Sequence, residues 1–328
     1  MERTVYDLSR KQRNRQIKKR VLTAFLFFQL TMSGFSQQTA STVEPPRTVD
    51  LEFKYEVSNP AFPEGEGPVV IVDEAHFNFH TSVGTYYPFS ELLKQDGYVL
   101  RRGRGKINRE LLESCRIYVI ADAQPPEKQG DPPTFTEEEI FALNKWVKSG
   151  GSLFVITDHL PDPWAIAPLA LSFGIEVNNG YILNGAPEKQ ELPIVFKKAG
   201  MDRIEENPIT RGRIPSEGIT QVATFSGSAF QAGDNFIPIL VFKSGRKSWM
   251  PKKYYDFDSD TPTVDVGGWY QGGVMEYGKG RIVFFAEAAM FTAQVFERGR
   301  TKVGMNHPQS KDNAQLLLNV VHWLSKIY

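Results

Sequence analysis

Short apolar runs recur along the chain, and each one ends abruptly in charged or polar residues. VVIVD (69–73), IYVIADA (117–123) and SLFVITDH (152–159) are the clearest of these runs. A short continuous apolar run is typical of a strand that is buried on both faces of a sheet. The pattern therefore predicts strands that lie at the centre of a folded domain.

Segments with helical periodicity separate the apolar runs. In FTEEEIFALNKWVKSGG (135–151), Thr136 and Glu139 form a capping box at the start, and Gly150 follows the last turn. DPWAIAPLALSFG (162–174) is a second predicted helix, and its first residue is the expected cap. Strands that alternate with helices imply right-handed crossovers and a parallel sheet.

The alternation stops in the middle of the chain and returns near its end. Residues 176–275 contain short strand-like runs, such as QVATF (221–225) and IPILVF (237–242), between many Gly and Pro residues. GRIVFFAEAAMF (280–291) is again a buried strand, and DNAQLLLNVVHWLSKIY (312–328) is an amphipathic helix. We therefore expect an α/β fold, a three-layer sandwich with a mostly parallel sheet and a β-rich insertion.

The N-terminal segment has the pattern of an export signal. Residues 1–36 carry eight Lys or Arg and two Asp or Glu, followed within the segment by the apolar run VLTAFLFFQL (21–30). Ten apolar residues are too few to span a bilayer comfortably, and small residues precede Gln37. We predict a signal peptide that is cleaved there and a periplasmic or secreted protein. The alternative is an uncleaved membrane anchor.

Three further segments complete the expected organisation. Residues 37–66 are rich in Ser, Thr, Pro and Glu and are expected to form a linker, with one edge strand at LEFKYEV (51–57). Residues 67–328 form the α/β domain, with the insertion at about 176–275. Cys115 is the single cysteine, so the chain can form no internal disulfide. Its stability must come from a large apolar core.

The charge distribution bears on the partners of the protein. The formal net charge of the chain is zero, but the basic N-terminal segment hides an acidic remainder with 30 basic and 36 acidic residues. A mildly acidic domain has no basic field that would attract nucleic acid. We expect no nucleic-acid partner and, after signal removal, no membrane contact. A small molecule or a glycan is the expected partner class, and the oligomeric state stays open.

Polar side chains follow every predicted buried strand. In an open parallel sheet, ligands bind outside the carboxyl ends of the strands, so these separate segments should meet at one edge. The side chains expected there are Asp73, Glu74, His76, His80, Asp122, Asp158, His159, Glu287, Asn306 and Asn313.

These residue types suit acid–base chemistry or metal binding. Asp158 or Glu287 would act as a general base, with His159 or His76 as the acid or as a metal ligand. The remaining side chains of the set are expected to bind the ligand. His76 and His80 are four residues apart, and with Asp158 and His159 they are the candidates for a divalent metal site. A divalent metal is the one cofactor that the sequence suggests.

The order of these motifs resembles a known superfamily. VVIVDEAH, IYVIADA, the capped helix with SLFVITDH, GRIVFFAEAAMF and DNAQLLLNVVHWL together resemble the class I glutamine amidotransferase-like superfamily, and most closely an uncharacterised bacterial branch with a domain of unknown function. The resemblance covers residues 67–175 and 274–328. It implies a flavodoxin-like, three-layer α/β fold with a ligand site at the strand ends.

The resemblance does not extend to the amidotransferase nucleophile. True amidotransferases place a cysteine in a tight turn after a central strand, where this chain has Asp158 and His159. Cys115 stands at the start of a strand instead, and the chain has no G-x-S-x-G motif of a serine hydrolase. We therefore expect a protein that does not hydrolyse glutamine.

Two classes of function remain open at this stage. The first is an enzyme, possessing hydrolase-like or lyase-like activity at the polar edge. The second is a non-catalytic module that binds a small molecule, a glycan or a partner protein at the same place. Aromatic side chains near this edge would suit stacking on a sugar, namely Phe77, Tyr86, Tyr87, Trp164 and Trp269.

Overall fold

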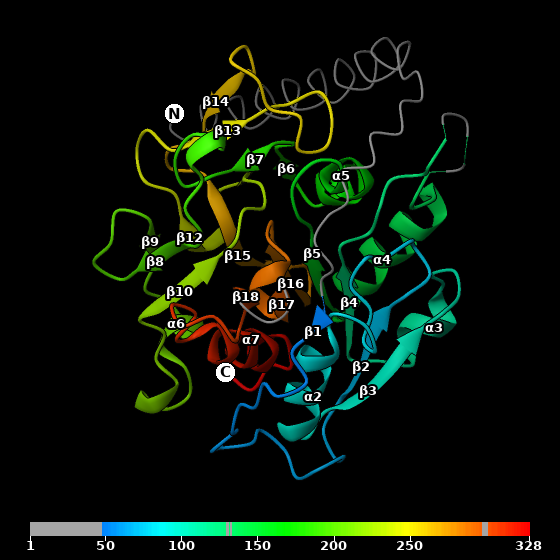
Figure 1. Ribbon diagram of the computed structural model, residues 1–328. Coiled ribbons are helices and arrows are strands. Elements are labelled where there is room, and N and C mark those ends of the chain that lie inside the picture. Colours follow the sequence, from blue (N-terminus) through cyan, green and yellow to red (C-terminus); the bar gives the residue numbers. More distant parts are fainter. Residues whose placement is uncertain (1–47, 129–130, 132, 297–300) are drawn as a thin grey trace, which may run out of the picture. The chain divides into compact units, whose positions relative to one another are not determined.

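The buried apolar runs form neighbouring strands of one twelve-stranded sheet (Figure 1). The computed structural model describes residues 48–128, 131, 133–296 and 301–328. Five strands make up the parallel half of the sheet, in the order β16 (Gly280–Phe285), β5 (Ser152–Ile156), β4 (Ile117–Ala121), β2 (Val69–Asp73) and β3 (Val99–Gly103). Their carboxyl ends lie at the same edge of the sheet because the strands run in one direction.

Helices cover both faces of the parallel strands and form two separate cores. One face packs against α2 (Tyr87–Gln95) and α7 (Asn313–Leu324), and the other packs against α3 (Arg109–Glu113), α4 (Glu137–Ser149) and α5 (Asp162–Ser172). Side chains alternate between the two cores: Val70 and Val72 of β2 belong to the first, and Ile71 belongs to the second. The predicted three-layer sandwich is confirmed.

The ends of two helices differ in how well the sequence predicted them. The capping box of α4 is present: the Glu139 N–H donates to Thr136 Oγ1 at 3.3 Å, and the Thr136 N–H donates to Glu139 Oε2 at 3.0 Å. The expected cap of α5 is wrong, because Pro161 is the N-cap residue and makes no side-chain cap bond. Asp162 is the first helical residue, and its carboxylate is buried in the domain.

The segment between α5 and β16 extends the sheet with mostly antiparallel strands. The path continues from β16 through β15 (Tyr270–Tyr277), β12 (Phe236–Val241), β9 (Arg203–Ile204), β8 (Ile194–Lys197) and β10 (Gln221–Thr224), while β11 (Phe230–Ala232) joins β15 to β6 (Ile175–Val177). A separate small sheet contains β14 (Thr263–Asp265), β13 (Lys247–Trp249) and β7 (Tyr181–Ile182). The short helix α6 (Pro208–Arg211) and two turns of 3-10 helix, Pro187–Lys189 and Pro215–Glu217, complete this segment.

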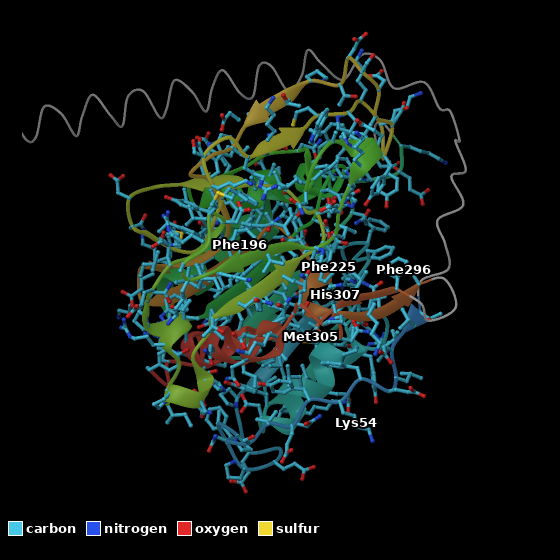
Figure 2. The ribbon with its side chains drawn as sticks, turned by 60° about the vertical axis from the view of Figure 1, so that its left-hand side comes forward. Lys54, Phe196, Phe225, Phe296, Met305 and His307 are labelled. Atoms are coloured by element: carbon cyan, nitrogen blue, oxygen red, sulfur yellow. The ribbon has the colours of Figure 1, made fainter. Side chains whose placement is uncertain are left out.

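A third sheet joins the first described residues to a hairpin near the end of the chain. It contains β1 (Thr48–Val49), β17 (Ala293–Phe296) and β18 (Thr301–Gly304), and a 3-10 turn at Ala289–Phe291 precedes the hairpin. Beside this hairpin, Phe225 contacts His307 edge to face, with ring centroids 5.3 Å apart (Figure 2). The hairpin therefore packs against the antiparallel half of the large sheet.

The N-terminal predictions have different outcomes. The edge strand expected at residues 51–57 is absent, because the pairing strand is β1 and lies just before that segment. Phe53 and Tyr55 instead pack, half-buried, against the core that contains α2 and α7. The predicted signal peptide, residues 1–36, lies outside the described residues, and the domain boundaries stay predictions. Among the residues described, no helix is both long enough and apolar enough to cross a membrane.

Candidate functional site

Three buried side chains of metal-ligand type meet at the carboxyl edge of the parallel strands. His80 comes from the segment between β2 and α2, Asp122 follows β4, and Asp158 follows β5. One ligand atom from each residue lies within 4.8 Å of the other two, and His80 Nε2 is 3.6 Å from Asp122 Oδ2. All three residues are buried. We call these three residues the His80 cluster.

The imidazole of His80 is held in an orientation that suits a ligand. Its Nδ1 is 2.5 Å from the hydroxyl oxygen of Thr85, and its ring stacks on Tyr86 with centroids 4.7 Å apart. When the Nδ1 proton is donated to Thr85, Nε2 keeps its lone pair on the side of Asp122. Such a fixed tautomer is the usual arrangement around a metal-binding histidine.

Asp158 is fixed by backbone donors and by its neighbours. Its Oδ1 accepts the N–H of His159 at 2.8 Å, and its Oδ2 accepts the N–H of Ala288 at 3.3 Å. The Ser228 hydroxyl donates to the Asp158 carbonyl at 2.9 Å. Ser228 belongs to the segment between α5 and β16, so that segment contributes directly to the position of the site.

Glu287 is an acidic neighbour of the His80 cluster. It follows β16, is fully buried, and accepts the N–H groups of Ala289 at 3.1 Å and Met290 at 2.8 Å. Burial, and then the charge of Asp158, raise the pKa of Glu287 well above its usual value, although these backbone donors oppose the shift. Burial and the neighbouring carboxylate therefore both disfavour the charged form of Glu287.

Asp162 is a second acidic neighbour. Its Oδ1 is buried and has no hydrogen-bond partner among the described residues. Burial raises the pKa of Asp162 to about 6, and the charge of Asp158 adds to the increase. A side-chain hydrogen bond with Asp122 and the charge of His159 act in the opposite direction. The site therefore concentrates carboxylates whose charges repel one another.

His159 lies beside Asp158 of the His80 cluster, but both of its ring nitrogens have other partners. Its Nδ1 donates to the Leu160 carbonyl at 3.0 Å, and its Nε2 accepts from the Tyr255 hydroxyl at 3.2 Å. Its ring stacks on Tyr181 with centroids 4.3 Å apart, and Nε2 is 3.8 Å from Asp158 Oδ1. Both ring nitrogens have partners, so the predicted roles as acid or metal ligand do not follow from this geometry.

His76 belongs to a different cluster, on the side of the sheet that packs against α4. Its Nδ1 donates to the Asp73 carboxylate at 2.8 Å, and its Nε2 donates to Glu139 Oε1 at 3.1 Å. The Tyr118 hydroxyl also donates to Asp73, at 2.8 Å, and Phe135 stacks on the imidazole. The candidate pair of His76 and His80 is therefore divided between two networks.

The two carboxylates of the His76 network hold its imidazole in the charged form. Burial opposes that charge, but the hydrogen bonds and charges of Asp73 and Glu139 outweigh it and raise the pKa of His76. For Glu139, burial raises the pKa, yet the Thr136 N–H and His76 lower it overall. Charged His76 and ionised Glu139 stabilise each other.

Glu74 has a structural place in the loop rather than a place in the His80 cluster. Its Oε1 accepts the N–H of Ser82 at 3.0 Å and the Ser82 hydroxyl at 2.6 Å, and its Oε2 pairs with Arg102. These contacts join the segment after β2 to the edge strand β3. The predicted ligand-binding role of Glu74 is not supported by this arrangement.

Asn306 and Asn313 are also engaged in contacts that join parts of the fold. The Asn313 amide exchanges hydrogen bonds with the backbone of Ala223 at 2.8 and 2.9 Å and donates to the Met290 carbonyl at 3.0 Å. Asn306 donates to Asp50 Oδ2 at 2.8 Å, beside the third sheet. The structure therefore places neither asparagine in the His80 cluster.

Sequence reasoning missed one residue that shapes the site. Thr85 lies just before α2, away from any strand end, so only its contact with His80 identifies it. Asp162, which the sequence placed after the strand at 152–156 and also at the start of a helix, is buried beside the cluster.

Several exposed aromatic side chains belong to the segments that contribute the His80 cluster and its neighbours. Their exposed fractions are 70% for Phe77, 49% for Phe79, 40% for Trp164 and 39% for Tyr255. Phe79 contacts the His80 ring edge to face, with centroids 5.1 Å apart. Tyr86, which the sequence placed near this edge, is completely buried and stacks on the His80 ring with centroids 4.7 Å apart. Trp269, which the sequence also placed there, is half-buried and packs against the core that contains α2 and α7.

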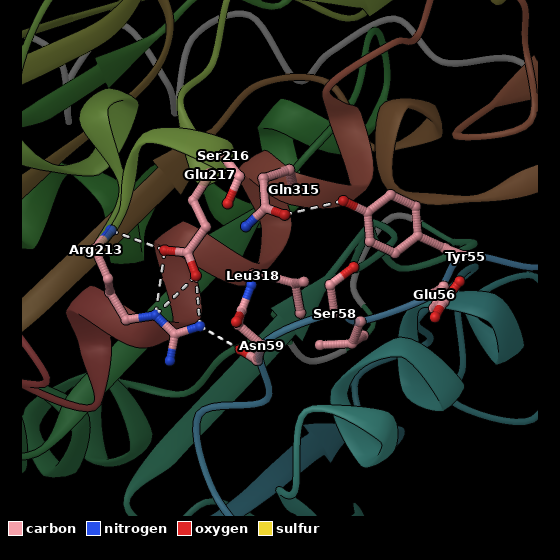
Figure 3. A pocket seen from close by; sticks show the side chains of 10 residues that line it. Tyr55, Glu56, Ser58, Asn59, Arg213, Ser216, Glu217, Gln315 and Leu318 are labelled. Atoms are coloured by element: carbon pink, nitrogen blue, oxygen red, sulfur yellow. Dashed lines mark hydrogen bonds and ion pairs between the residues drawn. The ribbon is translucent and has the colours of Figure 1, made fainter.

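Two pockets lie elsewhere on the domain. The first has a volume of about 120 Å³ and lies beside α7, where the Tyr55 hydroxyl donates to Gln315 and Arg213 pairs with Glu217 (Figure 3). The second has a volume of about 370 Å³ and is lined in part by Arg246. Neither pocket is lined by a residue of the His80 cluster.

Comparison with known proteins shows the fold but no family. No protein-family model and no curated protein matches the chain. The solved structure described as the mmIFT52 N-terminal domain is 13% identical, with a TM-score of 0.53, and covers 78% of this chain and 97% of that one. At this identity the likeness shows a shared fold alone.

The solved structures also include proteins with weaker likeness. A ThuA-like protein from Bacteroides uniformis is 13% identical, with a TM-score of 0.44, and covers 83% of this chain and 94% of that one. The cytoplasmic protein STM1381 from Salmonella typhimurium LT2 is 11% identical, with a TM-score of 0.45, and covers 78% and 98%. ThuA-like proteins have a glutamine amidotransferase-like fold.

Proposed function

We propose that this protein is an exported, metal-dependent hydrolase with a glutamine amidotransferase-like fold. His80, Asp122 and Asp158 bind the divalent cation. The observation that carries the proposal is the convergence of three buried ligand atoms, all within 4.8 Å of one another, from three separate segments. The donor set excludes neither zinc nor manganese, because imidazole suits zinc and carboxylates suit harder cations.

The spacing of the donor atoms supports a metal ion. Ligands about 2 Å from a tetrahedral zinc ion lie about 3.3 Å from one another. His80 Nε2 and Asp122 Oδ2 are 3.6 Å apart, close to that distance, and the remaining separations are within 4.8 Å. A bound cation would also relieve the repulsion that raises the pKa of Glu287 beside Asp158.

The side chains around the cluster suit hydrolysis of a small molecule or a glycan. A divalent cation bound to three protein ligands supplies a water molecule of lowered pKa. Thr85 orients His80, the Ala288 N–H orients Asp158, and the exposed rings of Phe77 and Phe79 offer apolar surface to a substrate. The protein would therefore position its substrate with aromatic contacts next to the buried cluster.

The position of the cysteine supports a chemistry that differs from that of the amidotransferases. Cys115 precedes β4, at the end of the strand opposite to Asp122. Burial raises the pKa of the Cys115 thiol to about 12, which disfavours the thiolate that a nucleophile requires. The expectation that the protein does not hydrolyse glutamine is consistent with both observations.

A non-catalytic carbohydrate-binding module is the second candidate function. The exposed aromatic rings, above all Phe77 at 70% exposure, favour it because aromatic faces present the apolar surface that sugar stacking needs. On this alternative the His80 cluster would be a structural metal site or a polar contact for the ligand. Metal binding without turnover of any ester, amide or glycoside substrate would favour the module.

The first test is the metal content of the purified protein. We would measure zinc and manganese by mass spectrometry in the wild type, in His80→Ala and in the control His307→Ala, after loading with either metal and removal of the excess. One metal per chain that is lost only in His80→Ala supports the proposal. A wild type that retains neither metal overturns it.

Export is tested separately. We propose that cleavage before Gln37 releases the domain outside the cytoplasm, on the basis of the basic and apolar pattern of residues 1–36. Fractionation of bacterial cells that express the full chain, with N-terminal sequencing, measures both the location and the first residue. A protein that stays in the cytoplasm with its first residues intact would contradict export and would leave the metal site untouched.

A further inference from the structure

Two residues in the segments that carry the His80 cluster have unusual backbone conformations. Phe77 has a φ angle of 54° and Asp122 has a φ angle of 52°, both in the left-handed region. Few residues other than glycine adopt these angles, and such residues persist where the surrounding contacts fix them. Asp122 is a proposed metal ligand, so the contacts that fix its backbone also set the direction in which its side chain leaves the chain.

Asn78 makes the contacts that connect these two positions. Its Nδ2 donates to the carbonyl of Ala121 at 3.1 Å, and its Oδ1 accepts the N–H of His76 at 3.1 Å. The next residue, Phe79, donates its N–H to the carbonyl of Asp122 at 2.9 Å. The peptide group before Asp122 is therefore hydrogen-bonded to Asn78, and the peptide group after it is hydrogen-bonded to Phe79.

Holding both peptide groups determines the conformation of the residue between them. The angles φ and ψ of Asp122 describe how these two groups rotate about its Cα atom. The Asp122 N–H also donates to the Ile156 carbonyl of β5, at 2.8 Å, which fixes the first peptide group to the sheet. The side chain of Asn78, together with the backbone groups of Phe79 and Ile156, therefore holds the backbone of Asp122 and sets the direction of its Cα–Cβ bond.

The Asn78 side chain also fixes the backbone just before His80. Asn78 accepts from the backbone of His76, whose imidazole is held by Asp73, and the chain then reaches His80 two residues after Asn78. We infer that Asn78 is a positioning residue of the metal centre, which holds Asp122 and His80 at binding distance without touching the metal. This inference rests on the proposed metal-binding function.

The test compares a near-isosteric variant with a control in the same loop. Asn78→Leu removes both side-chain hydrogen bonds without adding charge, whereas Ser82→Ala removes one bond to Glu74 that does not involve Asp122 or His80. The zinc affinity of each protein is measured by competition with a chromophoric chelator, and thermal unfolding is measured in excess chelator. The second measurement reports the stability of the metal-free protein.

We expect Asn78→Leu to bind zinc at least about 10-fold more weakly than the wild type, as is usual when a residue that orients a ligand is lost. Ser82→Ala should remain within about 2-fold of the wild type, because its contact does not hold a ligand. A purely structural role predicts a lower unfolding temperature for Asn78→Leu with unchanged zinc affinity, and that result overturns the inference.

A second variant keeps the test decisive where the first one does not fold. Asn78→Asp retains the acceptor for the His76 N–H and loses the donor to Ala121, so we expect weaker zinc binding from it as well. A wild type that binds no zinc overturns the proposed function itself. A wild type that binds zinc, with an Asn78→Asp that binds equally well, overturns only the role of Asn78.

Discussion

His76 and His80 stand four residues apart in the same loop, yet their surroundings differ in kind. Each nitrogen of His76 is within hydrogen-bond distance of a carboxylate, and these carboxylates raise its pKa and so favour the charged imidazole. His80 has a hydroxyl on one nitrogen and two carboxylates beside the other. The comparison teaches that spacing alone does not distinguish a histidine that ties the fold together from one that can bind a metal.

The largest expected effect is the loss in the free energy of unfolding when His76 is replaced, compared with the loss when His80 is replaced. His76→Ala leaves the buried carboxylates of Asp73 and Glu139 without their charged partner, so we expect a loss of about 3–5 kcal/mol in the free energy of unfolding. His80→Ala should cost about 1–2 kcal/mol in the metal-free protein. Urea unfolding in excess chelator measures both. Equal losses would remove the distinction drawn between the two networks.

The stabilisation that zinc provides should depend on His80 and not on the His76 network. At a free zinc concentration 100 times the dissociation constant, the wild type should gain about 2.7 kcal/mol in the free energy of unfolding. His80→Ala should gain almost nothing, because it lacks one ligand of the cluster. Tyr118→Phe, which perturbs only the His76 network, serves as the control and should gain as much as the wild type. Denaturant unfolding with and without zinc shows the difference.

A smaller effect is expected from the hydroxyl that supports Asp73. Tyr118→Phe removes a hydrogen bond to a buried carboxylate, and we expect a loss of about 1.5 kcal/mol in the free energy of unfolding. The same variant should leave zinc affinity unchanged. A large fall in zinc affinity would show that the His76 network and the His80 cluster are coupled more tightly than their contacts indicate.

The last expected effect is a change with pH in the stability that the His76 network contributes. Because the folded pKa of His76 is raised, its contribution is complete below about pH 6.5 and is lost as the pH rises through the folded pKa. The stability difference between wild type and His76→Gln should therefore narrow from pH 6 to pH 9, by at most about 1.4 kcal/mol per pH unit. A difference that grows over this range would contradict a charged His76.

The sequence was a good guide to the fold where local patterns decide the structure. The apolar runs located the parallel strands, and Thr136 with Glu139 located the start of α4, because burial and capping are properties of neighbouring residues. It also indicated that Asp122 and Asp158 should meet, since both follow parallel strands. These inferences need only strand direction and order.

The details of the site depended on contacts between distant segments. The order of the elements suggested that Asn313 lies near the strand ends, but its amide joins α7 to Ala223, which lies 90 residues earlier. His76 meets Glu139 across 63 residues. No local pattern contains such pairs, so the assignment of His76, Asn306 and Asn313 to the site could not be checked before the tertiary contacts were known.

The late position of β16 in the sequence has a consequence for biogenesis. This strand lies between β5 and β15 and joins the parallel half of the sheet to the antiparallel half. Until residues 280–285 have left the ribosome, the inner edge of each half has no partner. Exposed strand edges recruit chaperones and promote aggregation. A prematurely terminated chain would therefore remain an open sheet, which marks it for proteolysis rather than for release as a partly active product.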